Sequence, residues 1–231
     1  LDSLKNIEIK KFIFSSTASV YKNSIKILYE NSLTNPDNIY SKTKYQNEIQ
    51  IKTFFKNKKT NIYIFRFFNV CSADIANGFG ELHNPETHLI PILVNKAINN
   101  RVIKIYGNRY NTPDKTCIRD YIHINDLSSA IIKSIKTKNK KKFNIINLGS
   151  GRGYSILQLI KNLEIILKKK IKYEFIRKRF GDKAKLVCSI TKAQKSLLWF
   201  PIQSNLNKIF NDEIKWQNIL KKKNIKKKDV Y

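Results

Sequence analysis

The chain contains no methionine and little histidine, cysteine, glycine or proline among its 231 residues. Its three cysteines, Cys71, Cys117 and Cys188, lie far apart without a C-x-x-C pair. This arrangement disfavours both a disulfide framework and a structural zinc site, and it favours a reducing compartment. No stretch approaches the roughly 18 consecutive apolar residues of a membrane span, and no signal peptide opens the chain. We therefore expect a cytoplasmic protein with no membrane partner.

Two further absences carry expectations of their own. Only His83, His88 and His123 are present, and no carboxylate-linked pattern accompanies them, so we expect no metal site and no catalytic triad. The sequence begins at Leu1 and has no methionine anywhere, so we expect it to be a piece of a longer protein.

Acidic residues are scarce: the chain has 17 Asp and Glu residues but 45 Lys and Arg residues, which gives a formal net charge of +28. Such an excess is compatible with a nucleic-acid partner or a basic interaction module. However, no zinc-finger spacing, recognition-helix pattern or aromatic RNA-binding motif accompanies it. The lysines are scattered among Asn and Ile, which is typical of a solvated basic surface, and we expect no specific nucleic-acid partner. A hydrophobic content of 42% is enough for a buried core.

The order of apolar segments indicates an α/β fold. Residues 11–15 form a short apolar run that ends in hydroxyl residues, residues 38–57 have helical spacing, and residues 61–70 are strand-like. Strand, helix and strand in this order predict a parallel sheet covered by helices. Gly149, Gly151 and Gly153 look like a dinucleotide fingerprint, but they follow a late strand. We interpret them as a turn into a helix capped by Ser155.

Tyr40 and Lys44 carry the clearest chemical signal. They form Y-x-x-x-K at helical spacing, so both side chains project from one face, one turn apart. A nearby ammonium stabilises a phenolate, which lets a tyrosine act as a base. The motif alone occurs often by chance. Here a strand rich in hydroxyl residues, ending at Thr17, precedes it, and ligands of open α/β sheets bind at that edge.

With its surroundings, the motif resembles a known family. S-S-T-A-S-V-Y at residues 15–21 and N-P-D-N-I-Y-S-K-T-K at residues 35–44 are similar to the extended short-chain dehydrogenase/reductases. Further blocks narrow the resemblance to the UDP-glucose 4-epimerases: R-F-F-N-V, G-E-L-H-N-P-E-T-H-L-I-P, I-R-D-Y-I-H-I-N-D-L, N-L-G-S-G-R-G-Y-S and G-D-K-A, in the family's order. Together they extend from about residue 11 to residue 199.

The resemblance implies a fold and a domain arrangement. The chain would hold the C-terminal part of a Rossmann-type doubly wound parallel sheet, plus a smaller α/β substrate-binding lobe. Residues 1–75 would be the remainder of the NAD-binding domain, and residues 76–231 mainly the UDP-sugar lobe, with residues 117–150 returning to the sheet. The family's first strand and its G-x-x-G-x-x-G turn are absent, so NAD binding and stable folding of this chain alone are doubtful. A truncated sequence and a split protein are both open.

It also implies an activity: NAD-dependent interconversion of UDP-glucose and UDP-galactose, through oxidation at C4, rotation of the 4-keto sugar and return of the hydride. The complete protein would be a homodimer. Tyr40 would be the base, Lys44 its partner and a ligand of the nicotinamide ribose, and Thr17 would position the sugar O4. Phe68 would lie beside the nicotinamide. The residues implied for the UDP-sugar besides Thr17 are Asn69, His88, Leu89, Tyr106, Arg119, Arg179 and Asp182.

Other interpretations remain at this stage. Phe68 could be ordinary core, and Arg119 could pair with Asp120 or Asp126. Leu186 falls where the family varies side-chain size to admit N-acetylated sugars, and leucine is intermediate. The chain could also belong to another nucleotide-sugar reductase, although a dehydratase needs acids after Thr17 where Ala18 and Ser19 stand. A catalytically silent fragment that acts as a basic module is the alternative from another class.

Overall fold

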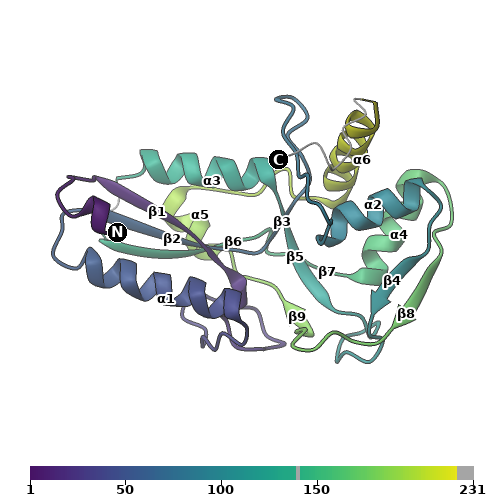
Figure 1. The fold of residues 1–231 in the computed structure, drawn as a ribbon, viewed down its shortest axis with the longest axis horizontal. Helices are drawn as coiled ribbons and strands as arrows, with labels where there is room; N and C mark the ends of the chain where they lie inside the picture. The colour runs from purple at the N-terminus through teal and green to yellow at the C-terminus, as the bar shows by residue number, and fades with distance from the viewer. Residues whose placement is uncertain (139–140, 223–231) are drawn as a thin grey trace.

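The protein extends from a parallel sheet at one end to a mainly helical lobe at the other, in a computed structural model that describes residues 1–138 and 141–222 (Figure 1). Strands β1 (Lys11–Thr17), β2 (Asn61–Phe67) and β6 (Phe143–Leu148) form the sheet in the order β1-β2-β6, with all pairs parallel. Thr17 lies opposite Phe67, and Phe67 lies opposite Leu148. The carboxyl ends of the three strands therefore meet at one edge.

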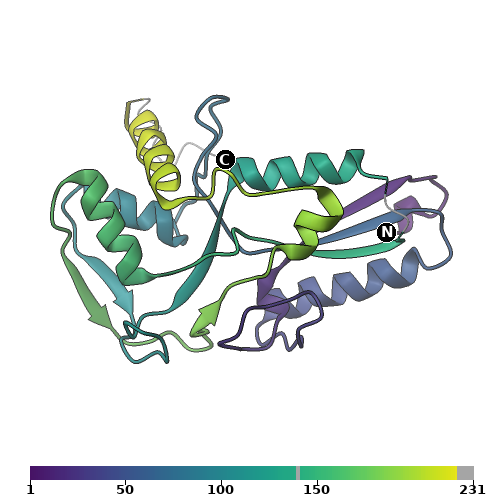
Figure 2. The same ribbon diagram turned by 180° about the vertical axis from the view of Figure 1, so that it is seen from behind.

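Helices cover both faces of this sheet (Figures 1 and 2). Helix α1 (Ile39–Phe54) lies on one face, and α3 (Ile124–Lys136) and α5 (Thr191–Leu197) lie on the other. Ile62 and Ile64 of β2 pack toward α1, whereas Tyr63 and Phe65 pack toward α3 and α5. The continuous apolar run of β2 is thus explained by burial on two sides, as is typical of parallel strands.

The start of α1 follows from its sequence. Asn38 has extended backbone angles, and its side-chain oxygen accepts a hydrogen bond from the backbone N–H of Ser41 at 2.9 Å. The Ser41 hydroxyl in turn accepts from the backbone N–H of Asn38 at 3.2 Å, which completes a capping box. The predicted helix over residues 38–57 is confirmed, and it ends three residues earlier.

A second group of strands connects the sheet to the lobe. Strand β3 (Asn69–Cys71) follows β2 after a single residue, Phe68, and pairs in parallel with β5 (Ile118–His123). Strand β7 (Gly153–Ser155) pairs with β5 in antiparallel orientation, and β9 (Lys185–Leu186) pairs with it in parallel. The glycine-rich segment leads through β7 into α4 (Ile156–Leu167), whose N-cap is Ser155, so the predicted turn is confirmed.

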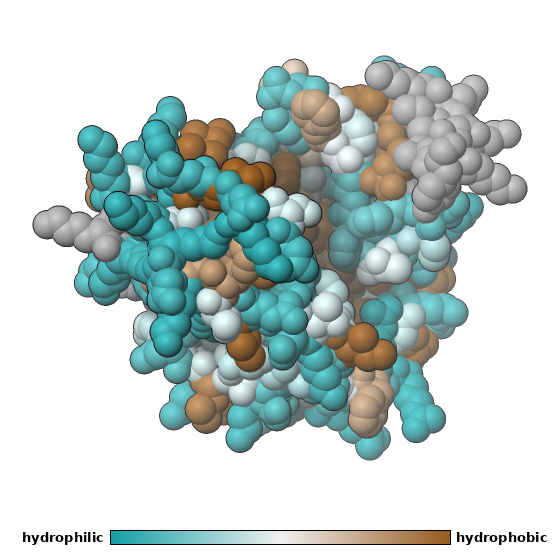
Figure 3. Space-filling model, turned by 60° about the vertical axis from the view of Figure 1, so that its left-hand side comes forward, coloured by the Kyte–Doolittle hydropathy of each residue, from teal (hydrophilic) through white to brown (hydrophobic). Residues whose placement is uncertain are grey.

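The lobe packs α2 (Leu89–Ile98), α4 and α6 (Leu206–Lys222) around the largest apolar cluster. A parallel pair, β4 (Ile103–Tyr106) and β8 (Tyr173–Ile176), borders it. Two short 3₁₀ helices, Asp2–Leu4 and Ala18–Val20, complete the regular structure of the described residues. Hydrophilic side chains cover much of the face in Figure 3, with separate hydrophobic areas between them. Within residues 1–138 and 141–222, no helix is long and apolar enough to span a membrane.

His123 joins β5 to α3 and is fully buried. Its Nδ1 accepts a hydrogen bond from the backbone N–H of Asn125 at 3.1 Å, so it caps the helix. Its Nε2 lies 3.3 Å from a carboxylate oxygen of Asp212 on α6. Burial lowers the pKa of His123, although the Asp212 carboxylate opposes this effect. A neutral ring with its proton on Nε2 satisfies both contacts.

Candidate active site

A cavity of about 560 Å³ opens between the carboxyl edge of the parallel sheet and the lobe. Its volume lies within the range of small-molecule sites. All eleven site residues predicted from the sequence line it: Thr17, Tyr40, Lys44, Phe68, Asn69, His88, Leu89, Tyr106, Arg119, Arg179 and Asp182. They come from seven separate regions of the chain, which the fold brings together.

Tyr40 and Lys44 occupy the sheet end of this cavity. Tyr40 is 57% exposed, and the Lys44 ammonium nitrogen lies 5.8 Å from the centre of its ring. Lys44 Nζ donates a hydrogen bond to the backbone carbonyl of Ser15 at 3.0 Å, which ties the first half of α1 to the end of β1. Thr17 is buried and is the last residue of β1, and its Oγ1 accepts a hydrogen bond from the backbone N–H of Ser19 at 3.2 Å. A phenol, an ammonium and a hydroxyl therefore face one space.

A buried ion pair below this group fixes α1 to the sheet. Glu48, one turn beyond Lys44, receives bonds from Arg66 of β2: Nη2 to Oε2 at 2.7 Å and Nε to Oε1 at 3.0 Å. Ser16 of β1 adds its hydroxyl to Oε1 at 2.5 Å. Burial opposes the charge of Arg66, but its hydrogen bonds to Glu48 and the neighbouring charges outweigh this effect and raise the pKa of Arg66. The sequence analysis missed this network, although Glu48 continues the four-residue spacing of Tyr40 and Lys44.

Phe68 and Asn69 lie where the two groups of strands meet. Phe68 is 4% exposed and lines the cavity wall, and its backbone N–H donates to the carbonyl of Leu148 at 2.9 Å. It also packs with the apolar cluster around Tyr21. Phe68 therefore belongs both to the core and to the wall of the cavity. The Asn69 amide donates to the carbonyl of Asp120 at 2.8 Å, which orients its side chain.

Arg119 and Asp182 form an ion pair at the lobe end of the cavity. The second oxygen of Asp182 accepts a hydrogen bond from the Tyr110 hydroxyl at 2.8 Å. Burial, followed by the hydrogen bond to Asp182, raises the pKa of Tyr110. The expected alternative partners of Arg119 are engaged elsewhere: Asp120 accepts from Ser150, Gly151 and Cys188, and Asp126 from residues 202–204.

Arg179 lies over the ring of Tyr106, with its guanidinium carbon 3.7 Å from the ring centre. A hydrogen bond with Arg179 lowers the pKa of Tyr106. Tyr106, one of the residues that the resemblance implies for the UDP-sugar, thus already packs one face of its ring against a guanidinium. At the other rim, His88 and Leu89 begin α2, and the backbone N–H of His88 donates to Glu86 Oε1 at 3.0 Å.

Comparison with known proteins identifies the family of the chain. The profile of the NAD dependent epimerase/dehydratase family matches residues 1–149. The chain belongs to this family. It is 34% identical over 211 residues to the UDP-glucose 4-epimerase of Rhizobium leguminosarum bv. trifolii, with 90% of this chain and 64% of that protein covered. The UDP-glucose 4-epimerase of Drosophila melanogaster is 33% identical over 226 residues, which cover 94% and 64%.

Solved structures of epimerases have the same fold. UDP-glucose 4-epimerase from Stenotrophomonas maltophila, with bound NAD and formylated UDP-arabinopyranose, superposes with a TM-score of 0.90 at 26% identity and covers 96% of this chain and 67% of that one. The enzyme from Bifidobacterium longum, in complex with NAD+ and UDP, gives a TM-score of 0.84 at 30% identity, with 94% and 66% covered. The chain spans about 64% of the length of the curated relatives it matches.

The structure adds cavity residues for which the epimerase-family motifs gave no specific expectation. Lys104, Cys117, Tyr121 and Ile156 also line the cavity. Nearby, the buried Lys183 ammonium donates to the backbone carbonyls of Tyr21 and Ser19 at 2.6 and 3.1 Å, and burial lowers its pKa. Lys183 belongs to the G-D-K-A block. The motif therefore indicated that this segment matters, but it did not predict the contact of Lys183 with residues 19 and 21. Leu186 packs against the cluster around Phe68 and is not among the cavity-lining residues of the described chain.

Proposed function

We propose that the protein to which this chain belongs is an NAD-dependent 4-epimerase that interconverts UDP-glucose and UDP-galactose. The observation that carries the proposal is the single cavity lined by all eleven predicted residues. The relatives bear this activity in their names. A homodimer in the cytoplasm, as expected from the sequence, belongs to the same proposal.

At the sheet end, we assign the proton transfer to Tyr40. Its exposed phenol faces the cavity, and Lys44 lies close enough to stabilise the phenolate electrostatically. The Thr17 hydroxyl lies at the same end and can orient the sugar O4 by a hydrogen bond. Tyr40 removes the proton from the C4 hydroxyl as hydride leaves C4, and it returns a proton when the other face of the 4-keto sugar is reduced.

The residues around this end also fit a nicotinamide cofactor. Phe68 supplies an apolar wall. Within the described residues, Lys44 donates one hydrogen bond, to the backbone carbonyl of Ser15, and its ammonium group has three N–H donors. Lys44 can therefore donate to ribose hydroxyls while it stabilises Tyr40. NAD, when bound, takes up the hydride from C4 and gives it back.

At the lobe end, we assign the nucleotide diphosphate to the two arginines. Arg119 and Arg179 lie on separate segments, and guanidinium groups bind phosphate oxygens with paired hydrogen bonds. Asp182 holds Arg119 in place and, with Asn69, offers polar contacts to the rest of the ligand. The distribution of groups matches a UDP-sugar, which has a neutral reacting sugar at one end and a charged diphosphate in the middle.

The deciding experiment replaces Tyr40 with Phe in the complete protein and measures conversion of UDP-galactose to UDP-glucose. Loss of the base should lower kcat by about 10²-fold or more, with folding unchanged because the side chain is exposed. Tyr173→Phe, which makes the same change on the exposed β8, is the matched control and should retain full activity. Near-normal turnover of Tyr40→Phe would exclude Tyr40 as the base.

A further inference from the structure

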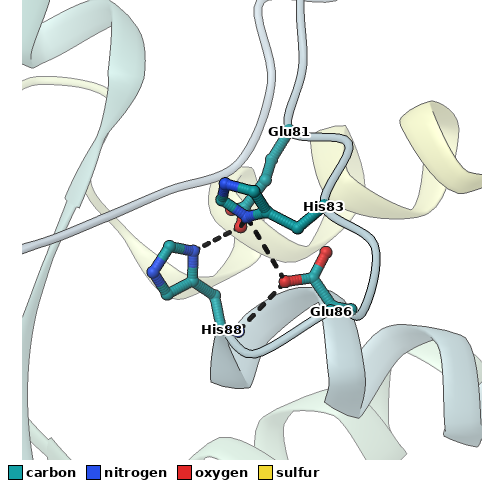
Figure 4. Close-up of side chains that lie close together, drawn as sticks. All are labelled: Glu81, His83, Glu86 and His88. Carbon is teal, nitrogen blue, oxygen red and sulfur yellow. Dashed lines mark hydrogen bonds and ion pairs between the residues drawn. The ribbon is translucent and has the colours of Figure 1, made fainter. Parts of the chain in front are cut away.

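The loop that leads into α2 gathers two histidines and two glutamates in one place (Figure 4). Glu81, His83, Glu86 and His88 each direct one potential ligand atom toward the others, and these atoms all lie within 4.8 Å of one another. The sequence analysis expected no metal because it found no carboxylate-linked histidine pattern. The fold creates such a pattern by bending residues 81–88 back on themselves.

The contacts within this cluster centre on one carboxylate oxygen. His83 Nδ1 lies 2.5 Å from Glu81 Oε1, and His88 Nδ1 contacts the same oxygen. His83 Nδ1 also lies 3.8 Å from Glu86 Oε1. The two rings stand edge to face, with centres 5.1 Å apart, so both present Nδ1 to the same space. Two imidazoles and two carboxylates that converge in this way resemble the donor set of a transition-metal site more than a chain of separate ion pairs.

Contacts with α6 hold the loop backbone independently of the four donor groups, and backbone hydrogen bonds orient one of these groups, the Glu86 carboxylate. Trp216 of α6 donates its indole N–H to the carbonyl of Glu81 at 2.7 Å. The preceding Gly80 lies so close to the Trp216 ring that a Cβ atom there would be 2.3 Å from it, which fixes the loop against α6. Glu86 Oε1 accepts from the backbone N–H groups of Thr87 and His88 at 2.9 and 3.0 Å, which orients its carboxylate.

We propose that this cluster is a binding site for a divalent metal ion of the zinc class. The ligands are Nδ1 of His83, Nδ1 of His88 and one carboxylate oxygen each from Glu81 and Glu86. In a tetrahedral site with bonds of about 2.1 Å, neighbouring donor atoms lie about 3.4 Å apart. The separations here bracket this value, so rotation of the two exposed histidine side chains, without backbone movement, brings the donors into place.

The donor chemistry selects the class of ion. Two imidazole nitrogens favour zinc and related transition metals, whereas magnesium and calcium prefer sites built from oxygen alone. Because His88 also lines the cavity, the ion stabilises the rim of the cavity where α2 begins. Its assigned role is structural, since all four protein ligands close the coordination sphere.

The test is a calorimetric titration of the untagged, chelator-treated and dialysed protein with ZnCl₂, with MgCl₂ in parallel. Saturable binding of one equivalent of Zn²⁺ is expected, with no comparable heat from Mg²⁺. His83→Gln and Glu81→Gln should each weaken Zn²⁺ binding by at least about 10-fold. Glu174→Gln, the same carboxylate-to-amide change at an exposed position of β8, should bind Zn²⁺ like the unaltered protein.

Absence of saturable Zn²⁺ binding, or equal affinity in all four proteins, overturns the proposal, and the cluster is then a set of histidine–carboxylate ion pairs. Far-UV circular dichroism checks that the variants fold. If they do not, Co²⁺ added to the unaltered protein decides instead. Intense visible absorption bands indicate the four-coordinate nitrogen and oxygen site, and weak octahedral bands refute it. Because the readout is metal binding, this result is separate from the outcome for Tyr40.

Discussion

The buried Glu48–Arg66 pair allows a sharp test of how the site is held. Replacing Glu48 with Gln keeps the size and one carbonyl acceptor but removes the charge that faces Arg66. Both side chains are almost completely buried, at 0% and 3% exposure, so water cannot replace the lost partner. An unpaired buried charge costs about 3–5 kcal/mol. We expect the lower end of this range, about 3 kcal/mol, because the Tyr21 ring, 4.7 Å from the guanidinium carbon, still faces Arg66.

The assay is urea unfolding of the purified protein, followed by far-UV circular dichroism. Glu8→Gln changes an exposed carboxylate in the same way and should lie within about 0.5 kcal/mol of the unaltered protein. The double variant Glu48→Met/Arg66→Met should recover most of the loss, since an apolar pair of similar volume replaces a desolvated ion pair. A cost below about 1 kcal/mol for Glu48→Gln, or a double variant as unstable as the sum of the single ones, would refute the reasoning.

Three further predictions concern other parts of the structure. Arg179→Ala should weaken UDP binding by about 1.5–3 kcal/mol in calorimetry, the usual scale for a lost charge-assisted hydrogen bond. His123 is buried with a lowered pKa. Its contribution to stability should therefore be complete above pH ~6.5 and decline as the pH falls through its folded-state pKa. Urea unfolding midpoints at pH 8 and pH 5.5 measure this difference. Gly149→Ala should destabilise the fold by about 1–3 kcal/mol in thermal unfolding, because the added Cβ would lie 2.8 Å from a buried carboxylate oxygen of Asp120.

Each of these has a result that contradicts it. Unchanged UDP affinity in Arg179→Ala would remove this arginine from the diphosphate site. His123→Asn, which keeps a capping oxygen but does not titrate, should lose part of the acid sensitivity, and an identical pH profile would show that His123 is not its source. A fully stable Gly149→Ala protein would mean that the turn beside β5 can shift without cost.

The elements with strong local signals were predictable from the sequence. Strands β1 and β2 correspond to apolar runs, and α1 corresponds to a segment with helical spacing of its apolar residues. Strand β8 was not predicted because it is mostly exposed and lacks an apolar run, and β9 has only two residues, which are ordered by pairing with β5. Helix α6 was also missed, although Leu206, Ile209 and Phe210 begin a clear apolar face.

The candidate site shows the same division between local and long-range information. The order of motifs led to eleven residues, which the fold gathers at one cavity, and their individual roles stay predictions. The Glu48–Arg66 pair could not be read from the sequence, because nothing local indicates that residues 18 apart face each other across a helix and a strand. The histidine–glutamate cluster depends on a bend in its loop and on contact with Trp216, which lies far away in the chain.

Phe68 is the only residue between β2, which ends at the sheet end of the cavity, and β3, which pairs with the strand that carries Arg119. Its ring is buried and its backbone is bonded to β6, so it acts as a rigid joint between two halves of one binding surface. The separation between the sheet end and the lobe end of the cavity is therefore set by the packing of the strands around Phe68. The binding mode proposed above therefore requires a ligand whose length matches the separation of the two ends, and a shorter or longer one would lose the contacts at one of them.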